Sequence, residues 1–276
     1  MRPAELLRRA EDYLSRHGVD NPRGDAEVLL GRVLDTDRAG LYSRSEPLAP
    51  DQAREFGRAL CRRCEGVPLQ HLTGDQPFRR IVLEVRPGVF VPRSETEMVV
   101  DVALERIAGT TCPNVVDVGT GTGAIALSIA SERPDARVMA TDVSAEAVEL
   151  AASNARRLAI EVSVLLGGFL EPIPPEHRGA LDLIVSNPPY VTAEEYEDLP
   201  TEVLADPVTA LVGGVEVYER LGFEAAGWLR PGGWLVAEIG ASQGPDVTTI
   251  LERSLTAVEI LPDLAGRDRV AIGRLA

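Results

Sequence analysis

Two short segments carry residue types that could do chemistry at one site. The first follows an apolar run and reads DVGTGTG from Asp117 to Gly123. Alternating glycines between a strand and a helix let a ligand approach the backbone and leave the helix N-terminal N–H groups free. Asp142 ends the next apolar run, where a carboxylate can accept both hydroxyls of a ribose. The glycines alone would suit a plain tight turn, but with the strand and the acid they predict a nucleoside cofactor.

The glycine spacing indicates which cofactor this is. It follows G-x-G-x-G rather than the G-x-G-x-x-G of dinucleotide-binding proteins, and Asp117 closes the preceding strand. An acid there suits a ligand with a cationic end and would lie badly beside a pyrophosphate. We therefore expect S-adenosylmethionine. Its expected binding residues are Gly119, Thr120, Gly121, Thr122 and Gly123 in the loop, and Asp142 on the next strand.

The second segment follows the buried run LDLIVS and reads Asn187-Pro188-Pro189-Tyr190. Ligands bind at the carboxyl ends of parallel strands, so this segment should face the same crevice as the glycine loop. Its prolines stiffen the backbone and leave carbonyl groups as acceptors. The side-chain carbonyl of Asn187 and the backbone carbonyl of Pro188 suit the two hydrogens of a planar NH₂ group, and the Tyr190 ring can stack on its face. Taken alone, the segment could also be a rigid turn with a core tyrosine.

From residue 113 onward, strands and helices alternate, and the strands are nearly continuous apolar runs. This pattern is expected when helices cover both faces of a mainly parallel sheet. We predict an α/β fold with a doubly wound, mainly parallel, seven-stranded Rossmann-like sheet. The predicted strands span 115–118, 137–142, 161–166, 181–186, 234–239, 256–261 and 268–274, and the helices span 122–132, 144–158 (capped by Ser144), 215–229 and 245–254.

Residues 3–66 repeat apolar residues at three- and four-residue steps, which predicts short amphipathic helices packed as a small bundle. Asn21-Pro22 should begin one helix and Gly66 should follow the end of another. Residues 76–92 predict a β-hairpin or extended linker, and Ser94 to Glu97 fit a capping box. The expected domains are a helical bundle at 1–75, a linker at 76–93 and a methyl-donor-binding domain at 94–276.

Composition and charge exclude several classes of protein. All 28 basic residues are arginine, which excludes Schiff-base enzymes and P-loop proteins because both need a lysine. The net charge of −15 comes almost wholly from residues 87–276, and so acidic a domain repels nucleic acid. There is no long apolar run for a membrane span and no signal-peptide pattern, so we expect a cytoplasmic protein. Cys61 and Cys64 have metal-like spacing without a second pair, so we expect reduced thiols.

The segments VVDVGTGTGAIALSIA, ATDVSAEAVELAASNA and SNPPYV resemble class I S-adenosylmethionine-dependent methyltransferases. Over almost its whole length the chain is most similar to the release-factor glutamine methyltransferases, the PrmC/HemK family. GVPLQHLTG at 66–74 is similar to that family's bundle-to-linker segment, and VPRSETE at 91–97 to its linker-helix segment. Its late motifs are matched by DPVTAL at 206–211, GGWL at 232–235, EIG at 238–240 and GRDRV at 266–270.

The resemblance implies methyl transfer from S-adenosylmethionine to the side-chain amide nitrogen, N5, of the glutamine in the Gly-Gly-Gln motif of class 1 peptide-chain release factors. Those factors would be the partners of a monomeric protein that binds no nucleic acid directly and no membrane. The implied cofactor contacts are Gly119, Gly121, Gly123, Asp142 on the ribose, Phe169 on the adenine, and Asn187. The implied catalytic and substrate contacts are Asn187, Pro188, Pro189 and Tyr190.

Three positions depart from that family's pattern. The acid usual before the adenine-packing position is Gly168, the proline usual after the linker arginine is Ser94, and the glutamate usual before Pro207 is Asp206. Gly168 leaves adenine recognition to backbone groups and Phe169. None of the three positions takes part in the transfer step.

The expected reaction is an in-line displacement at the methyl carbon, in which Asn187 and Pro188 orient the amide nitrogen and stabilise its developing positive charge. An adenine-N6 methyltransferase, or an enzyme acting on another protein glutamine, remains an alternative. A silent binding subunit is disfavoured by the intact motifs, and a nicotinamide oxidoreductase by the glycine spacing.

One further acidic run is either a solvated face or a surface that steers a basic partner, and it comprises Glu194, Glu195, Glu197, Asp198, Glu202 and Asp206.

Overall fold

The computed structural model describes residues 2–276, which fall into two compact units. The first unit comprises the chain up to Asp75 together with Pro200–Ala205. The second comprises Gln76–Leu199 and Asp206–Ala276. Within residues 2–276, no helix is both long and apolar enough to cross a membrane.

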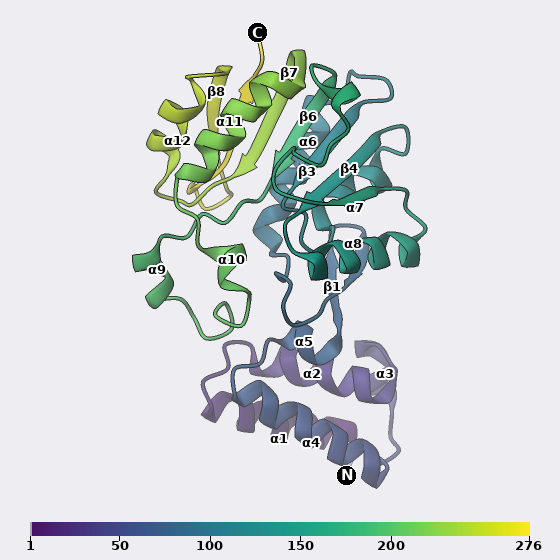
Figure 1. The fold of residues 1–276 in the computed structure, drawn as a ribbon. Coiled ribbons are helices and arrows are strands. Elements are labelled where there is room, and N and C mark those ends of the chain that lie inside the picture. Colours follow the sequence, from purple (N-terminus) through teal and green to yellow (C-terminus); the bar gives the residue numbers. More distant parts are fainter. Residues whose placement is uncertain (1) are drawn as a thin grey trace. The chain divides into compact units, whose positions relative to one another are not determined.

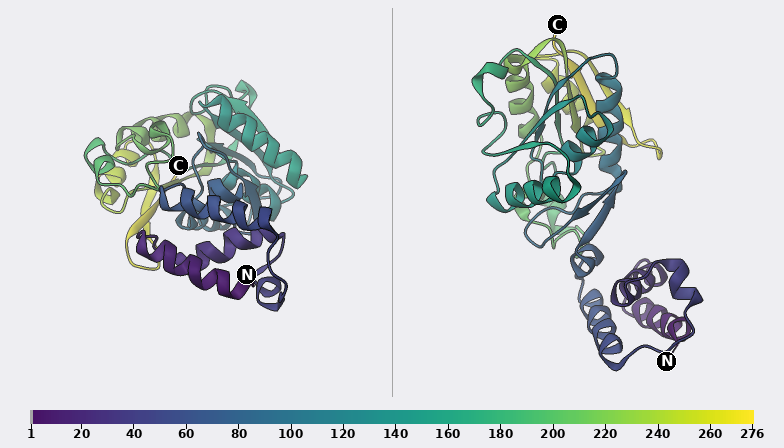
Figure 2. Two further views of the ribbon diagram at one scale, coloured as in Figure 1. Left: turned by 90° about the horizontal axis from the view of Figure 1, so that it is seen from below. Right: turned by 90° about the vertical axis from the view of Figure 1, so that its right-hand side faces the viewer.

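The first unit is a bundle of short helices around one apolar core (Figure 1, purple to blue), and Figure 2 shows these helices from two further directions. Leu7, Leu14 and Leu30 are fully buried in that core, and Phe56 is nearly so. Each helix has one apolar stripe, so the helices must pack together to bury it. They are α1 (Pro3–Arg16), α2 (Pro22–Leu34), α3 (Arg38–Ser43), α4 (Pro50–Cys64) and α5 (Leu69–Thr73).

Both helix ends expected in this unit are confirmed. The Asn21 side-chain oxygen caps α2 by accepting a hydrogen bond from the Gly24 N–H at 3.2 Å. Gly66 follows α4 with a φ of 87°, a left-handed conformation that favours glycine.

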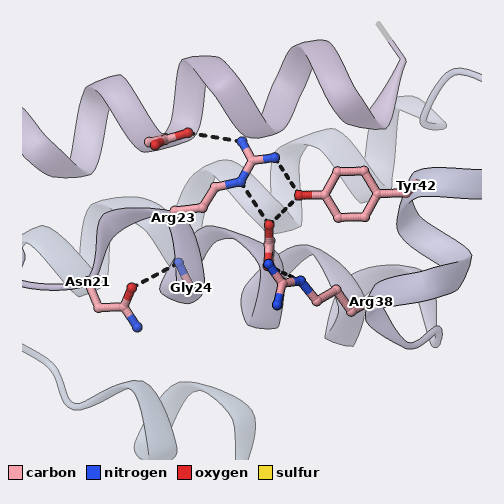
Figure 3. A network of polar contacts seen from close by, with 7 residues as sticks. Asn21, Arg23, Gly24, Arg38 and Tyr42 are labelled. Carbon is pink, nitrogen blue, oxygen red and sulfur yellow. Dashed lines mark hydrogen bonds and ion pairs between the residues drawn. The ribbon is translucent and has the colours of Figure 1, made fainter.

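A polar network around the buried side chain of Glu27 joins α1, α2 and α3 (Figure 3). Glu27 accepts hydrogen bonds from Arg23 at 2.8 Å and from the Tyr42 hydroxyl, and it pairs with Arg38 at 2.9 Å. Arg23 also donates to Glu11 on α1 at 2.9 Å. Because a buried carboxylate requires partners, this network holds the three helices in one arrangement.

A buried ion pair explains why Pro200–Ala205 belongs to the first unit. Arg63 of α4 is buried, and its Nε donates to Asp25 Oδ2 at 2.6 Å. The same guanidinium pairs with Glu202. Glu202 is therefore an ion-pair partner inside the bundle unit, although the sequence placed it in an acidic run.

A two-stranded sheet, β1 (Asp75–Phe78) and β2 (Ile81–Glu84), forms the expected hairpin. The capping box expected at Ser94 to Glu97 is wrong. Ser94 Oγ donates to Glu95 in a 3-10 turn, η1 (Ser94–Thr96), and α6 (Glu97–Arg106) begins only after that turn. The Glu97 carboxylate instead accepts the Arg79 N–H of the hairpin turn at 3.0 Å, so it does not return to the helix start.

The remainder of the second unit is a seven-stranded sheet with helices on both faces (Figures 1 and 2), which confirms the expected fold class. The strand order is β5-β4-β3-β6-β7-β9-β8, and every neighbouring pair is parallel except those that involve β9. The strands are β3 (Asn114–Val118), β4 (Arg137–Asp142), β5 (Ser163–Leu166), β6 (Leu181–Ser186), β7 (Leu229–Glu238), β8 (Thr256–Pro262) and β9 (Asp268–Arg274).

The helices of this unit bury apolar residues against the two sheet faces. Alternate residues of β3 separate the two cores: Val115 lies in the core with α6 and α7, and Val116 in the core with α11 and α12. The expected elements are present, although β7 begins earlier than predicted, at Leu229. The helices after α6 are α7 (Ala124–Glu132), α8 (Ala145–Leu158), α9 (Ala193–Glu197), α10 (Val208–Leu211), α11 (Glu216–Trp228) and α12 (Gly244–Leu251). The sequence did not predict α9 and α10, because helices this short carry little periodicity.

Candidate active site

The register of four neighbouring strands brings the chemical segments to one edge of the sheet. Thr141 of β4 pairs with Val118 of β3, Val118 pairs with Ser186 of β6, and Ser186 pairs with Ala237 of β7. The next residue of each strand or following loop therefore lies at the carboxyl edge. In order across the sheet, these edge residues are Asp142, Gly119, Asn187 and Glu238. Neighbouring strands are about 4.8 Å apart, so the glycine loop and the NPPY segment begin side by side.

The glycine loop turns tightly at the end of β3. The N–H groups of Gly119 and Thr120 both donate to the Thr141 carbonyl, at 2.9 and 3.0 Å. The Gly121 N–H donates to Asp142 Oδ2 at 2.8 Å. The loop is thus held against the end of β4, and α7 begins directly after it at Ala124.

Two of the glycines border open space. Gly119 and Gly121 have φ values of 74° and 55°, and a Cβ atom added at either would meet nothing within 4 Å. Gly123 differs, because an added Cβ would lie 2.9 Å from Leu127 Cδ1 and 3.3 Å from the Ala151 Cβ. Gly119 and Gly121 therefore form a cradle that can admit a ligand, whereas Gly123 allows the close packing of α7 and α8.

Asp117 braces the loop from beneath. It is fully buried, and its Oδ2 accepts hydrogen bonds from Thr120 Oγ1 at 2.7 Å and from the Ala126 N–H at 3.1 Å. Its Oδ1 is buried without a hydrogen-bond partner among residues 2–276. Burial raises the pKa of this carboxyl to about 7. A buried, half-satisfied acid directly below an open glycine cradle is suited to a ligand with a positively charged end.

Asp142 faces this cradle from β4. Besides the Gly121 N–H, it accepts the Ser144 N–H on Oδ1 at 2.9 Å. Each carboxylate oxygen keeps a further lone pair, so both can still accept a hydroxyl hydrogen. The Gly167 N–H donates to the Asp142 carbonyl at 2.8 Å, which places the loop after β5 beside the same edge.

Phe169 lies in that loop with a φ of 52°, a strained conformation for a bulky residue. Thr141 Oγ1 holds it there by donating to the Phe169 carbonyl at 2.7 Å. The guanidinium of Arg220 lies over the Phe169 ring, 4.0 Å from its centroid. One face of the ring is therefore covered by Arg220, and a Cβ added at the neighbouring Gly168 would contact Val143.

Asn187 directly follows β6 and is half-buried. Its Nδ2 donates to Thr96 Oγ1 at 3.1 Å, across 91 residues of sequence. No residue in 2–276 donates a hydrogen bond to its Oδ1. The residue before it, Ser186, ties β6 to the end of β3 by donating from Oγ to the Val118 carbonyl at 2.8 Å.

Tyr190 is held at both ends. Its hydroxyl donates to Glu238 Oε1 at 3.1 Å, and its carbonyl accepts from Gln243 Nε2 at 2.8 Å. Burial and the nearby Glu238 raise the pKa of the Tyr190 phenol well above its usual range, so it stays protonated. Burial likewise raises the pKa of Glu238, while the hydroxyls of Thr96 and Tyr190 act to lower it.

Pro189 of the NPPY segment packs against Gly213, a glycine that the sequence did not single out. A Cβ added at Gly213 would lie 2.1 Å from the Pro189 carbonyl oxygen, so only glycine fits there. Val191 forms an isolated bridge with Val212. Sequence reasoning also missed Gln243 and the roles of Thr96 and Glu238. Thr96 and Glu238 lie inside two segments that resemble family motifs, VPRSETE and EIG. That resemblance was the only signal in the sequence that could have pointed to them.

Comparisons with known proteins agree across the chain. A family model described as PrmC N-terminal domain matches residues 5–74, and one described as Methyltransferase small domain matches residues 81–263. The chain is 45% identical to the release factor glutamine methyltransferase of Moorella thermoacetica over 96% of this chain and 95% of that one. It is 38% identical to the protein of the same name from Deinococcus radiodurans, over 100% and 99%.

Solved structures share the fold. A 16S rRNA N2 G1207 methyltransferase of T. thermophilus, in complex with AdoMet and guanosine, superposes with a TM-score of 0.56 at 21% identity, covering 73% of this chain and 50% of that one. The catalytic domain of hMettl16 in complex with an RNA hairpin gives 0.58 at 15% identity, covering 70% and 74%. These likenesses support the Rossmann-like methyltransferase fold of the second unit. The sequence relatives go further and span nearly the full length, so the chain belongs to the release factor glutamine methyltransferase family.

Proposed function

We propose that this protein transfers a methyl group from S-adenosylmethionine to N5 of the glutamine in the Gly-Gly-Gln motif of class 1 peptide-chain release factors. The observation that carries the proposal is the edge row of the sheet, where Asn187 lies between the open glycine loop and Glu238. This row supports the proposal, because it brings the Asn187 amide beside the open glycine loop. The near full-length relatives of the same name support the choice of a glutamine amide over an adenine amine.

In this proposal, each cofactor-binding residue has one role. The backbone at Gly119, Thr120, Gly121 and Thr122 would form the cradle, and Gly123 would end the loop where α7 and α8 pack closely. Asp142 would accept the ribose hydroxyls, and Phe169 would offer its ring to the adenine. The buried carboxyl of Asp117, which braces the loop, would favour a ligand with a positively charged end. Bound S-adenosylmethionine supplies an electrophilic methyl group on a sulfonium.

The NPPY segment would hold the acceptor. Asn187 Oδ1 and the Pro188 carbonyl accept the two hydrogens of the glutamine NH₂, and Pro189 and Tyr190 enclose its plane. These acceptors direct the nitrogen lone pair toward the methyl group and stabilise the positive charge that develops on nitrogen. The bound cofactor would supply the methyl carbon and keep the electron pair of the broken bond as a thioether, and the acceptor nitrogen would lose one proton to solvent. Most of the rate enhancement comes from this positioning, which can supply several kcal/mol.

Three further assignments complete the proposal. Residues 1–75 form the substrate-recognition domain, 76–93 the linker and 94–276 the catalytic domain. The protein acts in the cytoplasm as a monomer. Its partner is the release factor, with no direct role for nucleic acid or membrane, in keeping with its net charge of −15.

The decisive experiment uses the full chain with radiolabelled S-adenosylmethionine. Intact release factor, release factor lacking the motif glutamine, and adenine-containing DNA are the three acceptors. We expect label only in intact release factor, with a one-methyl mass gain on the Gly-Gly-Gln peptide. Label in DNA, or equal label in the glutamine-free factor, would overturn the proposal.

The variant Asn187→Ala tests the role of the amide acceptor. We expect it to lose transfer by far more than tenfold, or about 1.4 kcal/mol, while the cofactor Kd changes little. Glu149→Ala, an exposed change on α8, is the matched control and should keep both properties. Transfer by Asn187→Ala within tenfold of the parent protein would contradict the role assigned to Asn187.

A further inference from the structure

An amide side chain can bind a substrate NH₂ only in one of its two orientations. The oxygen and nitrogen of Asn187 are nearly equal in size, but only the oxygen accepts a hydrogen bond. If the group were turned by half a rotation, its own NH₂ would face the NH₂ of the substrate, and neither could accept. The orientation of Asn187 therefore decides whether the acceptor site exists.

The only side chain among residues 2–276 that bonds the Asn187 amide is Thr96. Thr96 is the last residue of η1 and is 3% exposed, so no solvent replaces its contact. A hydroxyl can donate one hydrogen bond and also accept, so by itself it would bind either end of an amide. Something else must decide which end it binds.

Glu238 determines which end of the Asn187 amide Thr96 binds. It is the last residue of β7 and is 2% exposed, and the nearby Thr96 hydroxyl acts to lower the pKa of its carboxyl. Its Oε2 is buried and has no hydrogen-bond partner among residues 2–276. A carboxylate only accepts hydrogen bonds, so this unpartnered oxygen is a suitable acceptor for the single Thr96 proton. The Thr96 oxygen then offers Asn187 only lone pairs, and only Nδ2 can bind them.

We propose that Thr96 and Glu238 are positioning residues that orient the Asn187 amide with Oδ1 toward the substrate. The inference rests on the proposed function and adds two residues to it that do not touch the substrate. The same carboxylate accepts the Tyr190 hydroxyl at 3.1 Å, so Glu238 orients both the amide and the aromatic side chain of the acceptor pocket. A single buried acid thus determines the hydrogen-bond direction of the whole pocket.

We call the proposed series of hydrogen bonds from Asn187 through Thr96 to Glu238 the relay. Three variants of the full chain test it. Thr96→Val keeps the shape and removes the hydroxyl, and Thr96→Ser keeps the hydroxyl. Glu238→Gln keeps the shape but can donate to Thr96, which permits the wrong amide orientation. Thr248→Val is the matched control, because it removes a half-buried hydroxyl that bonds the Gly244 carbonyl at 2.8 Å within α12.

Single-turnover transfer to release factor, its KM, the cofactor Kd and the thermal midpoint are measured for each variant. We expect Thr96→Val and Glu238→Gln to lower the transfer rate about five- to tenfold, as for one lost hydrogen bond, with cofactor Kd and thermal midpoint almost unchanged. Thr96→Ser should restore the rate to within about twofold. A merely structural role would instead lower the thermal midpoint and leave the rate of the folded fraction intact.

Each result decides the matter. If Thr96→Val transfers methyl at the parental rate, the relay is wrong even though the proposed function stands. A loss in Thr96→Ser equal to that in Thr96→Val shows that shape rather than the hydroxyl matters, which also overturns it. Should Thr96→Val fail to fold, Glu238→Gln gives the answer alone, with a parental rate counting against the relay. Failure of the parent protein to label release factor would instead refute the proposed function.

Discussion

Arg93 and Asp206, 113 residues apart in sequence, form an ion pair that joins the linker segment to the chain just before α10. The Asp206 side chain is fully buried, and its other oxygen accepts the Val91 N–H at 3.1 Å. Burial raises the pKa of Asp206, and Arg93 and the Val91 N–H act to lower it. The linker segment and the later DP motif are therefore one structural feature, although the sequence shows them as two.

This relationship predicts a stability loss. Asp206→Ala leaves the Val91 N–H without its acceptor and Arg93 without its counterion, so we expect the free energy of unfolding to fall by about 2–4 kcal/mol. Denaturant unfolding measures the change. Asp198→Ala, an exposed acid nearby in sequence, should change it by less than about 0.5 kcal/mol. A loss at Asp206 no larger than at Asp198 would show that the pair is incidental.

Two glycines of the loop should differ in their effects on cofactor binding and on the stability of the protein. In Gly121→Ala, the new methyl group projects into open space, so we expect the cofactor Kd to rise at least tenfold while stability falls by about 1 kcal/mol from the left-handed backbone. In Gly123→Ala, the methyl group meets Leu127 and Ala151, and we expect a larger stability loss of about 2–3 kcal/mol. Calorimetric titration and denaturant unfolding distinguish them, with the exposed Gly109→Ala as control. Equal effects on cofactor binding at both sites would contradict the cradle.

Asp117 predicts a pH dependence of stability. Its pKa in the folded protein is about 7, well above the value of an exposed aspartate, so the folded state holds a proton that the unfolded state releases. The free energy of unfolding should therefore fall as pH rises from about 4 to 7, by at most about 1.4 kcal/mol per pH unit from this group. Asp117→Asn removes this contribution, so its stability relative to the parent should increase between pH 5 and pH 8.

The control for that experiment is Asp135→Asn. Arg133 lowers the pKa of Asp135 to about 2, so this group stays ionised in both states across the same pH range. Its stability difference from the parent should be flat between pH 5 and pH 8. A flat difference for Asp117→Asn as well would show that its carboxyl titrates normally.

The acidic run predicts a salt-dependent association rate. Glu202 and Asp206 are engaged with Arg63 and Arg93, so the exposed charges are on α9 and just after it. The triple variant Glu194→Gln, Glu197→Gln, Asp198→Asn spares Glu195, which caps α9. We expect it to slow association with a basic release-factor surface several-fold at low salt and to reduce the salt dependence. Stopped-flow binding measures both.

The comparison for this triple variant is Asp246→Asn, Glu252→Gln, Glu259→Gln, which makes the same charge change at exposed positions from α12 to β8. If both triples slow association equally, only net charge matters. The acidic segment would then be an ordinary solvated surface.

The sequence by itself determined which residue types stand at the ends of which strands. Alternation of apolar runs gave the order of the strands along the chain, and β4 and β6 have the predicted bounds. The glycine loop, Asp142 and the NPPY segment each follow such a run directly. These features are local, because a period of two or of 3.6 residues and a turn motif are expressed within a few neighbours. Their meeting at one edge then follows from parallel pairing.

Only the tertiary structure decided how the site is supported. The sequence suggested a capping role for Ser94 to Glu97, yet Glu97 bonds the hairpin turn and Thr96 bonds Asn187. The acidic run seemed continuous, yet Glu202 and Asp206 face different partners. These contacts join residues 18 to 139 positions apart, and they depend on how the fold places distant segments rather than on neighbouring residues. No local pattern records them, because a hydroxyl or a carboxylate acquires its role only from what the fold places opposite it.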